Sequence, residues 1–431
     1  PPAVKVAADQ SARKDFEGSD LIVAKEQTVS YGNPTLRFTH RTARVTVILT
    51  DYTEGMASVK LTGLSTENGN PAQIIPYDKG NDTYTALVAP QSVATGTAFI
   101  TCAFTNGKVF VYKMQSDTHW QAGEEYTYTV SLAAAKDPGY TVSEDGKTYE
   151  VYNAEGLKNI AELVNEEWKL DINITLTNNI DLTGIDWTPI GKDDNKAYTG
   201  TFDGNGKTIT GLTVTRSNRY TGLFGFIKGT VKNVVLTEVN ITSGTFVGGV
   251  AGWSFGGNIE NCSVSGSVSG SSGSDVGGVV GYQQVGSITG CSSSATVKGT
   301  ERAGGVVGVT NGGTTPLTAC YATGNVTVEN DGTSNAWAGG IVGMNGTGTL
   351  IACYAAGNVS GNIVGGAVGV NYATVTACYW SGLPDNDNGG ATKVDGTTVT
   401  WQNAVDAMNN ALNGSGWQYE LTGALPTLKK Q

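Results

Sequence analysis

The chain has 431 residues, of which 60 are glycine and only 15% are charged, and its formal net charge is −11. This length allows two or three domains, and the glycine-rich, charge-poor composition favours an extracellular β-protein over a cytosolic enzyme. The acidic balance argues against nucleic acid or an anionic membrane as a partner. No segment reaches about 18 consecutive apolar residues, so the sequence predicts no transmembrane helix.

The first 135 residues show the two-residue alternation of strands that bury one face. Residues 36–40 alternate in one phase and residues 43–49 in the other, which predicts a bulge or bend at Arg41-Thr42. A further alternating run at 98–104 precedes Asn106-Gly107, a two-residue hairpin signal. Residues 1–135 are therefore predicted to form an antiparallel β-sandwich.

Several phrases in this region resemble the fimbrillin-like family of Bacteroidetes, namely Ser19-Asp20-Leu21, Leu36-Arg-Phe-Thr-His-Arg-Thr-Ala43, Ala89-Pro-Gln91 and Trp120-Gln-Ala-Gly123. That family comprises subunits, anchors and tip proteins of type V pili and related surface lipoproteins. The resemblance implies a lipoprotein precursor exported to the outer surface, with an anchoring cysteine outside this chain. It also implies contacts with other pilus subunits through the N-terminal domain.

Residues 136–147 are polar and rich in turn-forming residues, and they predict a linker to a second domain at 148–431. Asn153 suits the N-cap of a helix over about 154–165, whose apolar residues fall on one face. This helix is expected to cover the open end of the structure that follows. Near the C-terminus, a helix at 401–412 and a strand at 421–428 predict a second cap over about 401–428.

Two phrases recur in step between residues 221 and 380. A four-residue glycine phrase occurs six times at intervals of 26 to 35 residues, and five cysteines follow its later copies by 12 to 15 residues. Such spacing, with short apolar bursts between turns, predicts a solenoid of stacked β-coils. The glycines are Gly222, Gly225, Gly249, Gly252, Gly278, Gly281, Gly305, Gly308, Gly340, Gly343, Gly366 and Gly369. The cysteines are Cys262, Cys291, Cys320, Cys353 and Cys378.

The paired glycines are expected at corners that need a positive φ or a close backbone approach. The five cysteines are expected to form one inward ladder of free thiols, because coils about 4.8 Å apart are too far apart for the roughly 3.8 Å Cβ separation of a disulfide. Parallel crossovers are nearly always right-handed. The predicted fold class is therefore all-β: an antiparallel β-sandwich followed by a right-handed parallel β-helix with short capping helices.

The first glycine phrase, Gly222-Leu-Phe-Gly225, and its flanking phrases Asn179-Ile-Asp-Leu-Thr183 and Trp187-Thr-Pro-Ile-Gly191 resemble the GLUG motif. This motif occurs in secreted and surface proteins of Bacteroidetes and some Gram-positive bacteria. Later coils depart from it by replacing Leu-Phe with Val-Ala, Val-Val, Ile-Val or Ala-Val. The resemblance implies a structural repeat and no enzymatic activity.

Outward aromatic residues are the candidate ligand-binding positions. Aromatic rows on a rigid rod suit sugar or protein binding, and they also suit covering coil edges or contacting the other domain. One row follows successive glycine phrases, a second directly follows the cysteines, and a single tryptophan adjoins the insertion at 329–335. The candidates are Trp253, Phe255 and Tyr282, then Tyr321, Tyr354 and Tyr379, and finally Trp337.

Catalytic and metal-binding groups are sparse. A glycosidase needs two carboxylates about 5–10 Å apart, whereas the acids of the repeats are dispersed and are expected to be isolated solvated charges. Asp275 and Glu301 come nearest, at adjacent corners. Asp385-Asn-Asp387-Asn resembles the start of a calcium loop but lacks the later bidentate glutamate, so a polar turn is favoured and no metal or cofactor is predicted.

Together these features predict a non-enzymatic cell-surface adhesin or pilus (tip) subunit. Its solenoid would present a binding face to a surface glycan or an extracellular protein. The alternatives are a carbohydrate-active β-helix enzyme and a purely structural surface stalk. Because the chain begins at Pro1 without an initiator Met or a signal peptide, a processed product at the extracellular or outer-membrane surface is expected.

Overall fold

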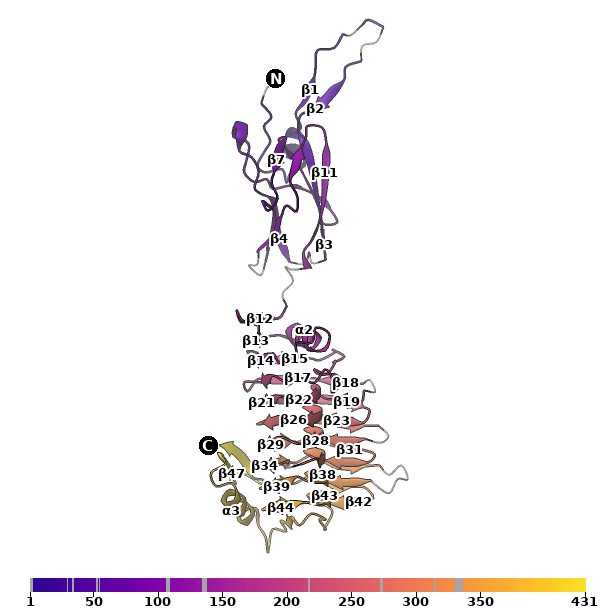
Figure 1. The fold of residues 1–431 in the computed structure, drawn as a ribbon, viewed down its shortest axis with the longest axis vertical. Coiled ribbons are helices and arrows are strands. Elements are labelled where there is room, and N and C mark those ends of the chain that lie inside the picture. The colour runs from indigo at the N-terminus through magenta and orange to yellow at the C-terminus, as the bar shows by residue number, and fades with distance from the viewer. Residues whose placement is uncertain are drawn as a thin grey trace. The chain divides into compact units, whose positions relative to one another are not determined.

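The computed structural model describes residues 3–28, 30–32, 35–51, 53, 55–105, 109–133, 138–215, 218–271, 274–313, 315–329 and 336–431. The chain forms two compact units, Pro1–Asp137 and Pro138–Gln431 (Figure 1). The first consists of short strands in small sheets, and the second is a stack of parallel coils.

The first unit packs two sheets face to face. One holds β11 (Glu125–Ser131), β3 (Ala43–Thr50), β6 (Thr83–Val88) and β5 (Tyr77–Gly80), and the other holds β4 (Met56–Leu61), β8 (Ala98–Phe104) and β9 (Val109–Lys113). Their inner faces share one buried core that includes Val45, Val130, Ile100 and Cys102. This confirms the predicted β-sandwich, with the difference that β3 and β11 pair in parallel.

A two-stranded ribbon of β1 (Ile22–Ala24) and β2 (Phe38–His40) precedes the core strands. Leu36 and Phe38 are 48% and 57% exposed, so the alternation at 36–40 does not mark a buried face, because a lone ribbon has no second layer to cover it. The chain leaves the ribbon at residues 41–42, where a bend was predicted, and enters β3. Asn106-Gly107 lies outside the described residues, and the strands on either side of it, β8 and β9, pair antiparallel.

Short elements complete this unit. They are α1 (Arg13–Gly18), a 3-10 turn at Glu67–Gly69, and a pair formed by β7 (Gln91–Val93) and β10 (Thr118–Trp120).

The second unit begins with the predicted capping helix, α2 (Ala154–Asn165). The Asn153 side chain accepts a hydrogen bond from the Gly156 amide at 2.8 Å, which is the expected N-cap contact. Leu157, Ile160 and Val164 on one helix face join the solenoid core. The helix therefore covers the first coil, as its apolar periodicity predicts.

Two large sheets form one side of the coils. The ten-stranded sheet holds β12 (Tyr140–Val142), β13 (Thr148–Val151), β14 (Asn173–Leu176), β16 (Thr201–Asp203), β21 (Thr230–Lys232), β25 (Asn258–Glu260), β29 (Ser287–Thr289), β34 (Leu317–Thr318), β39 (Thr349–Ile351) and β44 (Thr374–Thr376). The thirteen-stranded sheet holds β15 (Ile180–Asp181), β17 (Thr208–Thr210), β18 (Thr213–Val214), β22 (Val235–Ser243), β26 (Ser263–Gly270), β30 (Ser292–Ser293), β31 (Thr296–Gly299), β35 (Tyr321–Ala322), β36 (Val326–Val328), β40 (Tyr354–Ala355), β41 (Val359–Ser360), β45 (Tyr379–Trp380) and β46 (Thr392–Lys393). Apart from the antiparallel β12–β13 pair, their strands pair in parallel from coil to coil.

Two six-stranded parallel sheets form the other side. The β19 sheet holds β19 (Tyr220–Thr221), β23 (Phe246–Gly248), β27 (Asp275–Gly277), β32 (Arg302–Gly304), β37 (Trp337–Gly339) and β42 (Ile363–Gly365). The β20 sheet holds β20 (Phe224–Ile227), β24 (Ala251–Phe255), β28 (Val280–Gln284), β33 (Val307–Asn311), β38 (Val342–Asn345) and β43 (Val368–Asn371). The predicted parallel β-solenoid is confirmed.

The five repeat cysteines form the predicted inward ladder. All are buried and free, and each thiol lies within hydrogen-bonding distance of the carbonyl two residues earlier, 3.4 Å for Cys353 and Ile351. Burial raises the pKa of the Cys291, Cys320 and Cys378 thiols. They behave as small apolar residues of the core.

The twelve repeat glycines serve close approach rather than a special backbone angle. None of them has a positive φ. A Cβ atom added to any of them would lie only 2.1 to 2.7 Å from another heavy atom, such as the Gly340 carbonyl oxygen at Gly305. The positive φ occurs instead at the residue before each cysteine, for example Asn261, Gly290 and Ala319. Of the two expected roles of the paired glycines, only close packing applies.

The C-terminal segment runs along a flank of the solenoid instead of closing its end. It consists of α3 (Trp401–Ala411) and a hairpin of β47 (Trp417–Glu420) and β48 (Thr427–Lys430), so the predicted strand at 421–428 is mostly the hairpin's turn. Its apolar residues pack on Ala319 and Ala352 of earlier coils, and Lys430 pairs with Glu260 at 2.6 Å. Figure 1 shows this yellow segment beside β34, β39 and β44.

Candidate ligand-binding face

Two outward rows lie side by side on the β19 and β20 sheets. In each row, one residue per coil occupies the same register position. The row on the β19 sheet is Tyr220, Phe246, Asp275, Arg302, Trp337 and Ile363. The row on the β20 sheet is Phe226, Trp253, Tyr282, Val309, Met344 and Val370. We call the five aromatic residues of the first three coils, Tyr220, Phe226, Phe246, Trp253 and Tyr282, the aromatic strip.

The rings of the aromatic strip stack on one another. Trp253 lies 4.1 Å from Tyr282 between ring centroids with planes 15° apart, and Phe226 lies 6.0 Å from Trp253 at 7°. Phe246 meets Trp253 edge to face at 4.5 Å. Because the stacking direction follows the solenoid axis, the Trp253 ring is covered on both faces by Phe226 and Tyr282, and Phe226 itself is only 5% exposed. The strip thus offers ring edges rather than flat stacking surfaces.

Two cations lie against the strip. The Arg219 guanidinium is 5.1 Å from the Tyr220 ring centroid and 5.9 Å from that of Phe246. The Lys228 ammonium is 5.7 Å from the Phe226 centroid and 6.0 Å from that of Phe255, which is 42% exposed. Such contacts contribute about 0.5–1 kcal/mol each at exposed sites. They place positive charge at the first coils of the strip.

The polar atoms of the strip are only partly paired. The Tyr282 hydroxyl accepts a hydrogen bond from Asn311 at 3.1 Å. The buried indole N–H of Trp253 has no acceptor among the described residues. An unmade hydrogen bond of this kind costs about 1–3 kcal/mol. The packing of the rings therefore leaves the Trp253 indole N–H without a hydrogen bond among the described residues.

Asp275 corrects the prediction of isolated solvated acids. It is only 1% exposed, and both of its oxygens bind the Arg302 guanidinium, at 2.5 and 3.1 Å. Glu301 binds the same guanidinium at 3.2 Å. Burial raises the pKa of Asp275 to about 7, against the opposing attraction of Arg302. Asp275 and Glu301, the acids of adjacent corners, thus share the Arg302 guanidinium. Asp275 is too deeply buried to contact a substrate.

The remaining candidates lie in different surroundings. Trp337 is half-buried in the register position after Arg302, and the neighbouring residues 330–335 lie outside the described part of the chain. Tyr321 and Tyr354 stack at 5.0 Å with planes 2° apart, as an outward row predicts. However, Tyr354 is only 1% exposed, because the C-terminal segment covers it and its hydroxyl donates to the Pro426 carbonyl at 2.6 Å. The prediction that Tyr354 is exposed is therefore wrong.

Tyr379, the third member of that row, is half-buried and packs against the same C-terminal cluster. We call Tyr321, Tyr354 and Tyr379 the covered row. Its members contact the chain's own C-terminal segment.

The weak metal candidates have other partners. Asp387 accepts hydrogen bonds from the amides of Ala367 and Val368 with one oxygen, both at 2.8 Å, and from Gly389 and Ala391 with the other. Asp385 pairs with Lys393. No group of three potential metal ligands occurs among the described residues. The loop at 385–390 thus pairs with backbone N–H groups of the last coil, at the end of the β20 sheet.

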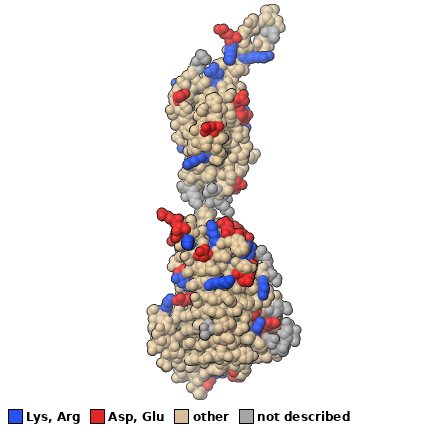
Figure 2. All heavy atoms as spheres, viewed as in Figure 1, with Lys and Arg blue, Asp and Glu red and all other residues tan. Residues whose placement is uncertain are grey.

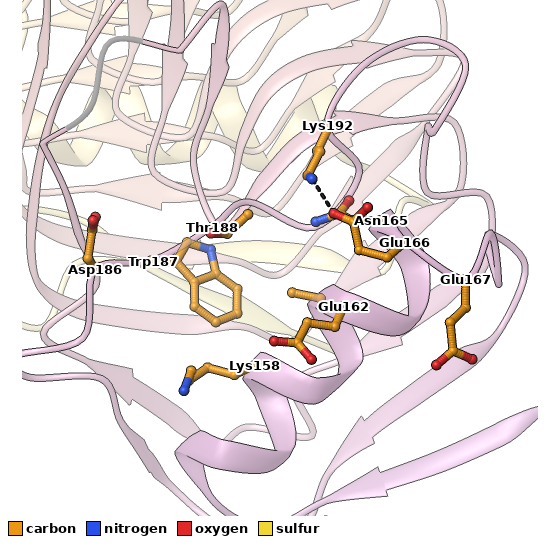
Figure 3. Close-up of a pocket in the computed structure, with 10 residues that line it drawn as sticks. Lys158, Glu162, Asn165, Glu166, Glu167, Asp186, Trp187, Thr188 and Lys192 are labelled. Atoms are coloured by element: carbon orange, nitrogen blue, oxygen red, sulfur yellow. Dashed lines mark hydrogen bonds and ion pairs between the residues drawn. The ribbon is translucent and has the colours of Figure 1, made fainter.

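Two adjoining cavities lie at the first coil, of about 380 and 310 Å³, and both are lined by Thr188 and Lys192. Figure 3 shows the larger one, where the Trp187 indole lies beside α2 and Lys192 reaches Glu166. Its lining holds four acidic side chains, Glu162, Glu166, Glu167 and Asp186, and two lysines, so negative charge predominates there among the described residues. The smaller cavity extends to Arg219 and Tyr220, where the aromatic strip begins.

The sequence reasoning missed three residues of the strip, Tyr220, Phe226 and Phe246. Phe246 lies three positions before a glycine phrase, as do Asp275, Arg302 and the predicted candidate Trp337, a shared phase that would have grouped them. Tyr220 and Arg219 lie before the first phrase, where the spacing shifts by one. The position before the phrase is thus as informative as the position after it.

Comparisons with known proteins agree with this architecture. Residues 2–145 match the fimbrillin-like family, and residues 243–269 and 272–298 match the GLUG motif. The chain joins a fimbrillin-like domain to a GLUG-repeat solenoid. Among the described residues, no helix is both long and apolar enough to cross a membrane.

Related sequences cover parts of much longer proteins. Halomucin of Haloquadratum walsbyi is 30% identical over 227 residues, which are 50% of this chain and 2% of halomucin. A candidate Gly-rich membrane protein of Evansella cellulosilytica is 36% identical over 124 residues, which are 27% of this chain and 14% of that protein. The chain therefore spans only a small fraction of the relatives it matches.

A crystal structure from Bacteroides ovatus, described as a candidate immunoglobulin A1 protease, is similar with a TM-score of 0.53. The two chains are 20% identical, and the match covers 67% of this chain and 94% of the other. At this identity the likeness shows a shared fold.

Proposed function

We propose that the protein is a non-enzymatic cell-surface adhesin or pilus (tip) subunit. In this proposal the fimbrillin-like domain connects it to the outer surface or to other pilus subunits. The GLUG solenoid presents the aromatic strip to a surface glycan or an extracellular protein. The observation that carries the proposal is the strip itself, a stack of five aromatic rings on three coils, in which Tyr220, Phe246, Trp253 and Tyr282 are half-buried and Phe226 is 5% exposed.

Rigid display supports this role. Phe246, Trp253 and Tyr282 lie on strands that pair with a coil on each side, and Tyr220 and Phe226 lie on the first strands of their sheets. The rings therefore keep fixed spacings without a ligand. A preorganised surface loses little conformational entropy on binding. Aromatic anchors of this kind contribute a large share of the free energy at many protein interfaces.

The acids around the strip favour binding over hydrolysis. A glycosidase needs one carboxylic acid and one carboxylate facing the same sugar. Asp275, whose pKa is raised to about 7, is bound by Arg302 and is only 1% exposed. Its proton is therefore not presented to a ligand on this face.

The test is binding of the full chain to an array of glycans and extracellular-matrix proteins. We expect at least one specific partner whose affinity falls tenfold or more, about 1.4 kcal/mol, in Tyr282→Ala and in Trp253→Ala. Tyr31→Ala in the first unit removes a fully exposed tyrosine and serves as the matched control. Thermal unfolding of each variant separates lost contacts from lost folding.

Three outcomes would contradict the proposal. Silence across the array would favour a structural stalk. Loss of binding in Tyr31→Ala alone would place the site in the fimbrillin-like domain. Release of shortened glycans would support a carbohydrate-active enzyme instead.

A further inference from the structure

The chemistry of the aromatic strip favours one class of ligand. An aromatic ring carries negative charge density on its faces and positive partial charge at its edge. In the strip the Trp253 ring is stacked on both faces, between Phe226 and Tyr282, and Phe226 is only 5% exposed, so little ring face is left for a ligand to stack on. A surface of ring edges attracts oxygen atoms that carry negative charge, and it gives a neutral sugar little flat area for stacking.

The two strip cations add full positive charge. Among the described residues, neither Arg219 nor Lys228 pairs with a carboxylate, and the Lys228 ammonium donates to a backbone carbonyl, that of Asp194, at 3.2 Å. The nearest acids are Asp193 and Asp194, and one oxygen of Asp193 accepts the amides of Asn195 and Lys196. The guanidinium of Arg219 keeps its donors available, because its contacts are to ring faces.

The smaller cavity continues this pattern. Its volume is about 310 Å³, and it is lined by Thr188, Pro189, Lys192, Asn218, Arg219 and Tyr220. These described residues include two cations and no acid, although Lys192 also pairs with Glu166, which lines the larger cavity. The planar fork of arginine fits carboxylate and sulfate groups with two parallel hydrogen bonds. The cavity thus opens beside the first ring of the strip with donors on its wall.

We infer that the strip binds an acidic glycan, a sugar chain bearing carboxylate or sulfate groups, with one anionic group held in the cavity by Arg219. This rests on the proposed function, since it names the ligand class of the same face. The net charge of −11 works against binding of an acidic glycan, because the chain as a whole repels polyanions. Binding must then come from the local arrangement of Arg219 and Lys228, because on the face in view Figure 2 shows acidic and basic side chains mixed at the first coils of the second unit and few charges on later coils.

The experiment measures the affinity of the full chain for three polysaccharides: heparin as the sulfated probe, hyaluronan as the carboxylated probe and dextran as the neutral one. Each is measured at 50 and 200 mM NaCl. We expect one of the two acidic probes to bind, with weaker binding at the higher salt because the contact is electrostatic. Which acidic probe binds more tightly identifies the anionic group.

Arg219→Gln is the deciding variant, and it is expected to weaken acidic-probe binding at least tenfold. Lys228→Gln is expected to weaken it less, since Lys228 lies beside the strip but does not line the cavity. Arg37→Gln makes the same charge change at an exposed position of the first unit and is expected to leave binding unchanged.

The two ideas fail differently. If dextran or another neutral glycan binds as tightly, and binding depends on Trp253 but not on Arg219, the acidic-ligand inference is overturned while the adhesin proposal stands. If acidic probes bind equally in Arg219→Gln and in the unaltered protein, the cavity is not the site and the inference is likewise overturned. If no glycan or protein on the array binds at all, both are overturned.

Discussion

The aromatic strip and the covered row are both stacked aromatic rows, but only the covered row packs against the C-terminal segment. Both consist of outward rings repeated from coil to coil, and both contain parallel stacks, 4.1 Å between Trp253 and Tyr282 and 5.0 Å between Tyr321 and Tyr354. The covered row is sealed by α3 and the β47–β48 hairpin, whereas the strip lies beside cations and a cavity. An outward aromatic row therefore marks a contact surface, and only the rest of the chain determines whether the contact is internal.

The residue before each repeat cysteine also differs between coils that the C-terminal segment covers and coils that it leaves exposed. This residue has a positive φ in successive coils. Before Cys262 it is the exposed Asn261, which donates to the Asn233 side chain at 2.8 Å. Where the C-terminal segment packs, it is Gly290, which meets the Trp417 ring, or a buried alanine such as Ala319. A left-handed alanine is unfavourable by roughly 1–2 kcal/mol, a cost that its burial offsets.

The largest predicted effect comes from removing the cover. Trp417→Ala deletes a buried ring that lies over Gly290 and is expected to lower the free energy of unfolding by about 3–5 kcal/mol. It should also expose Tyr354, which would then become accessible to chemical modification of tyrosine. Denaturant unfolding and mass spectrometry of the modified protein measure both effects. Glycan binding should be unchanged, and a loss of binding would contradict the separation of the two rows.

The next effect is a pH dependence of stability that arises at Asp275, the residue that follows Phe246 in the row on the β19 sheet. The pKa of Asp275 is raised to about 7 from an unfolded value near 3.8. Between these values the folded chain holds a proton that the unfolded chain releases, so this group's stabilisation is full below pH 4 and is lost as pH rises to about 7. Each unit of pKa difference corresponds to about 1.4 kcal/mol. Asp275→Asn should abolish this decline, measured as the unfolding free energy from pH 4 to 8.

A decline of the same size in the Asp275→Asn protein would assign the pH dependence to other groups. A flat profile in the unaltered protein would show that Arg302 keeps Asp275 ionised in the folded state.

A smaller effect is expected at the uncovered corner. Asn261→Ala loses one side-chain hydrogen bond and places alanine at a φ of 52°, so the unfolding free energy should fall by about 1–2 kcal/mol. The matched change in the covered region is Ala352→Gly, which relieves the left-handed strain but loses a buried methyl group and should lie within about 1 kcal/mol of zero. Equal losses at both sites would remove the distinction between covered and uncovered corners.

The smallest effect is expected for the thiols. All six cysteines are buried, and those of the repeats lie inside the wall that carries the covered row. The native protein should therefore react with a thiol reagent at none of them until it is denatured. Trp417→Ala should leave this unchanged, because it uncovers the outer side of the wall only. Rapid labelling of the native repeat cysteines would contradict the inward ladder.

Much of the solenoid was predictable because its interactions repeat. Each coil pairs with its neighbours in the same register, so one requirement, such as an inward cysteine or a close-packed glycine, appears at a regular spacing in the sequence. The bounds of α2 followed from local rules, since Asn153 caps it and its apolar residues share one face. The β-sandwich strands followed from alternation in the same way.

The tertiary structure alone determined which surfaces are covered. Lys430 meets Glu260 across 170 residues, and the Tyr354 hydroxyl meets Pro426 across 72, contacts that occur once and leave no period. Asp275 resembles any other acid at a coil corner until Arg302 from the next coil encloses it. Sequence thus determined the coils, because neighbouring coils impose the same constraint again and again. Which aromatic row is covered depends on single long-range contacts, which periodicity does not encode.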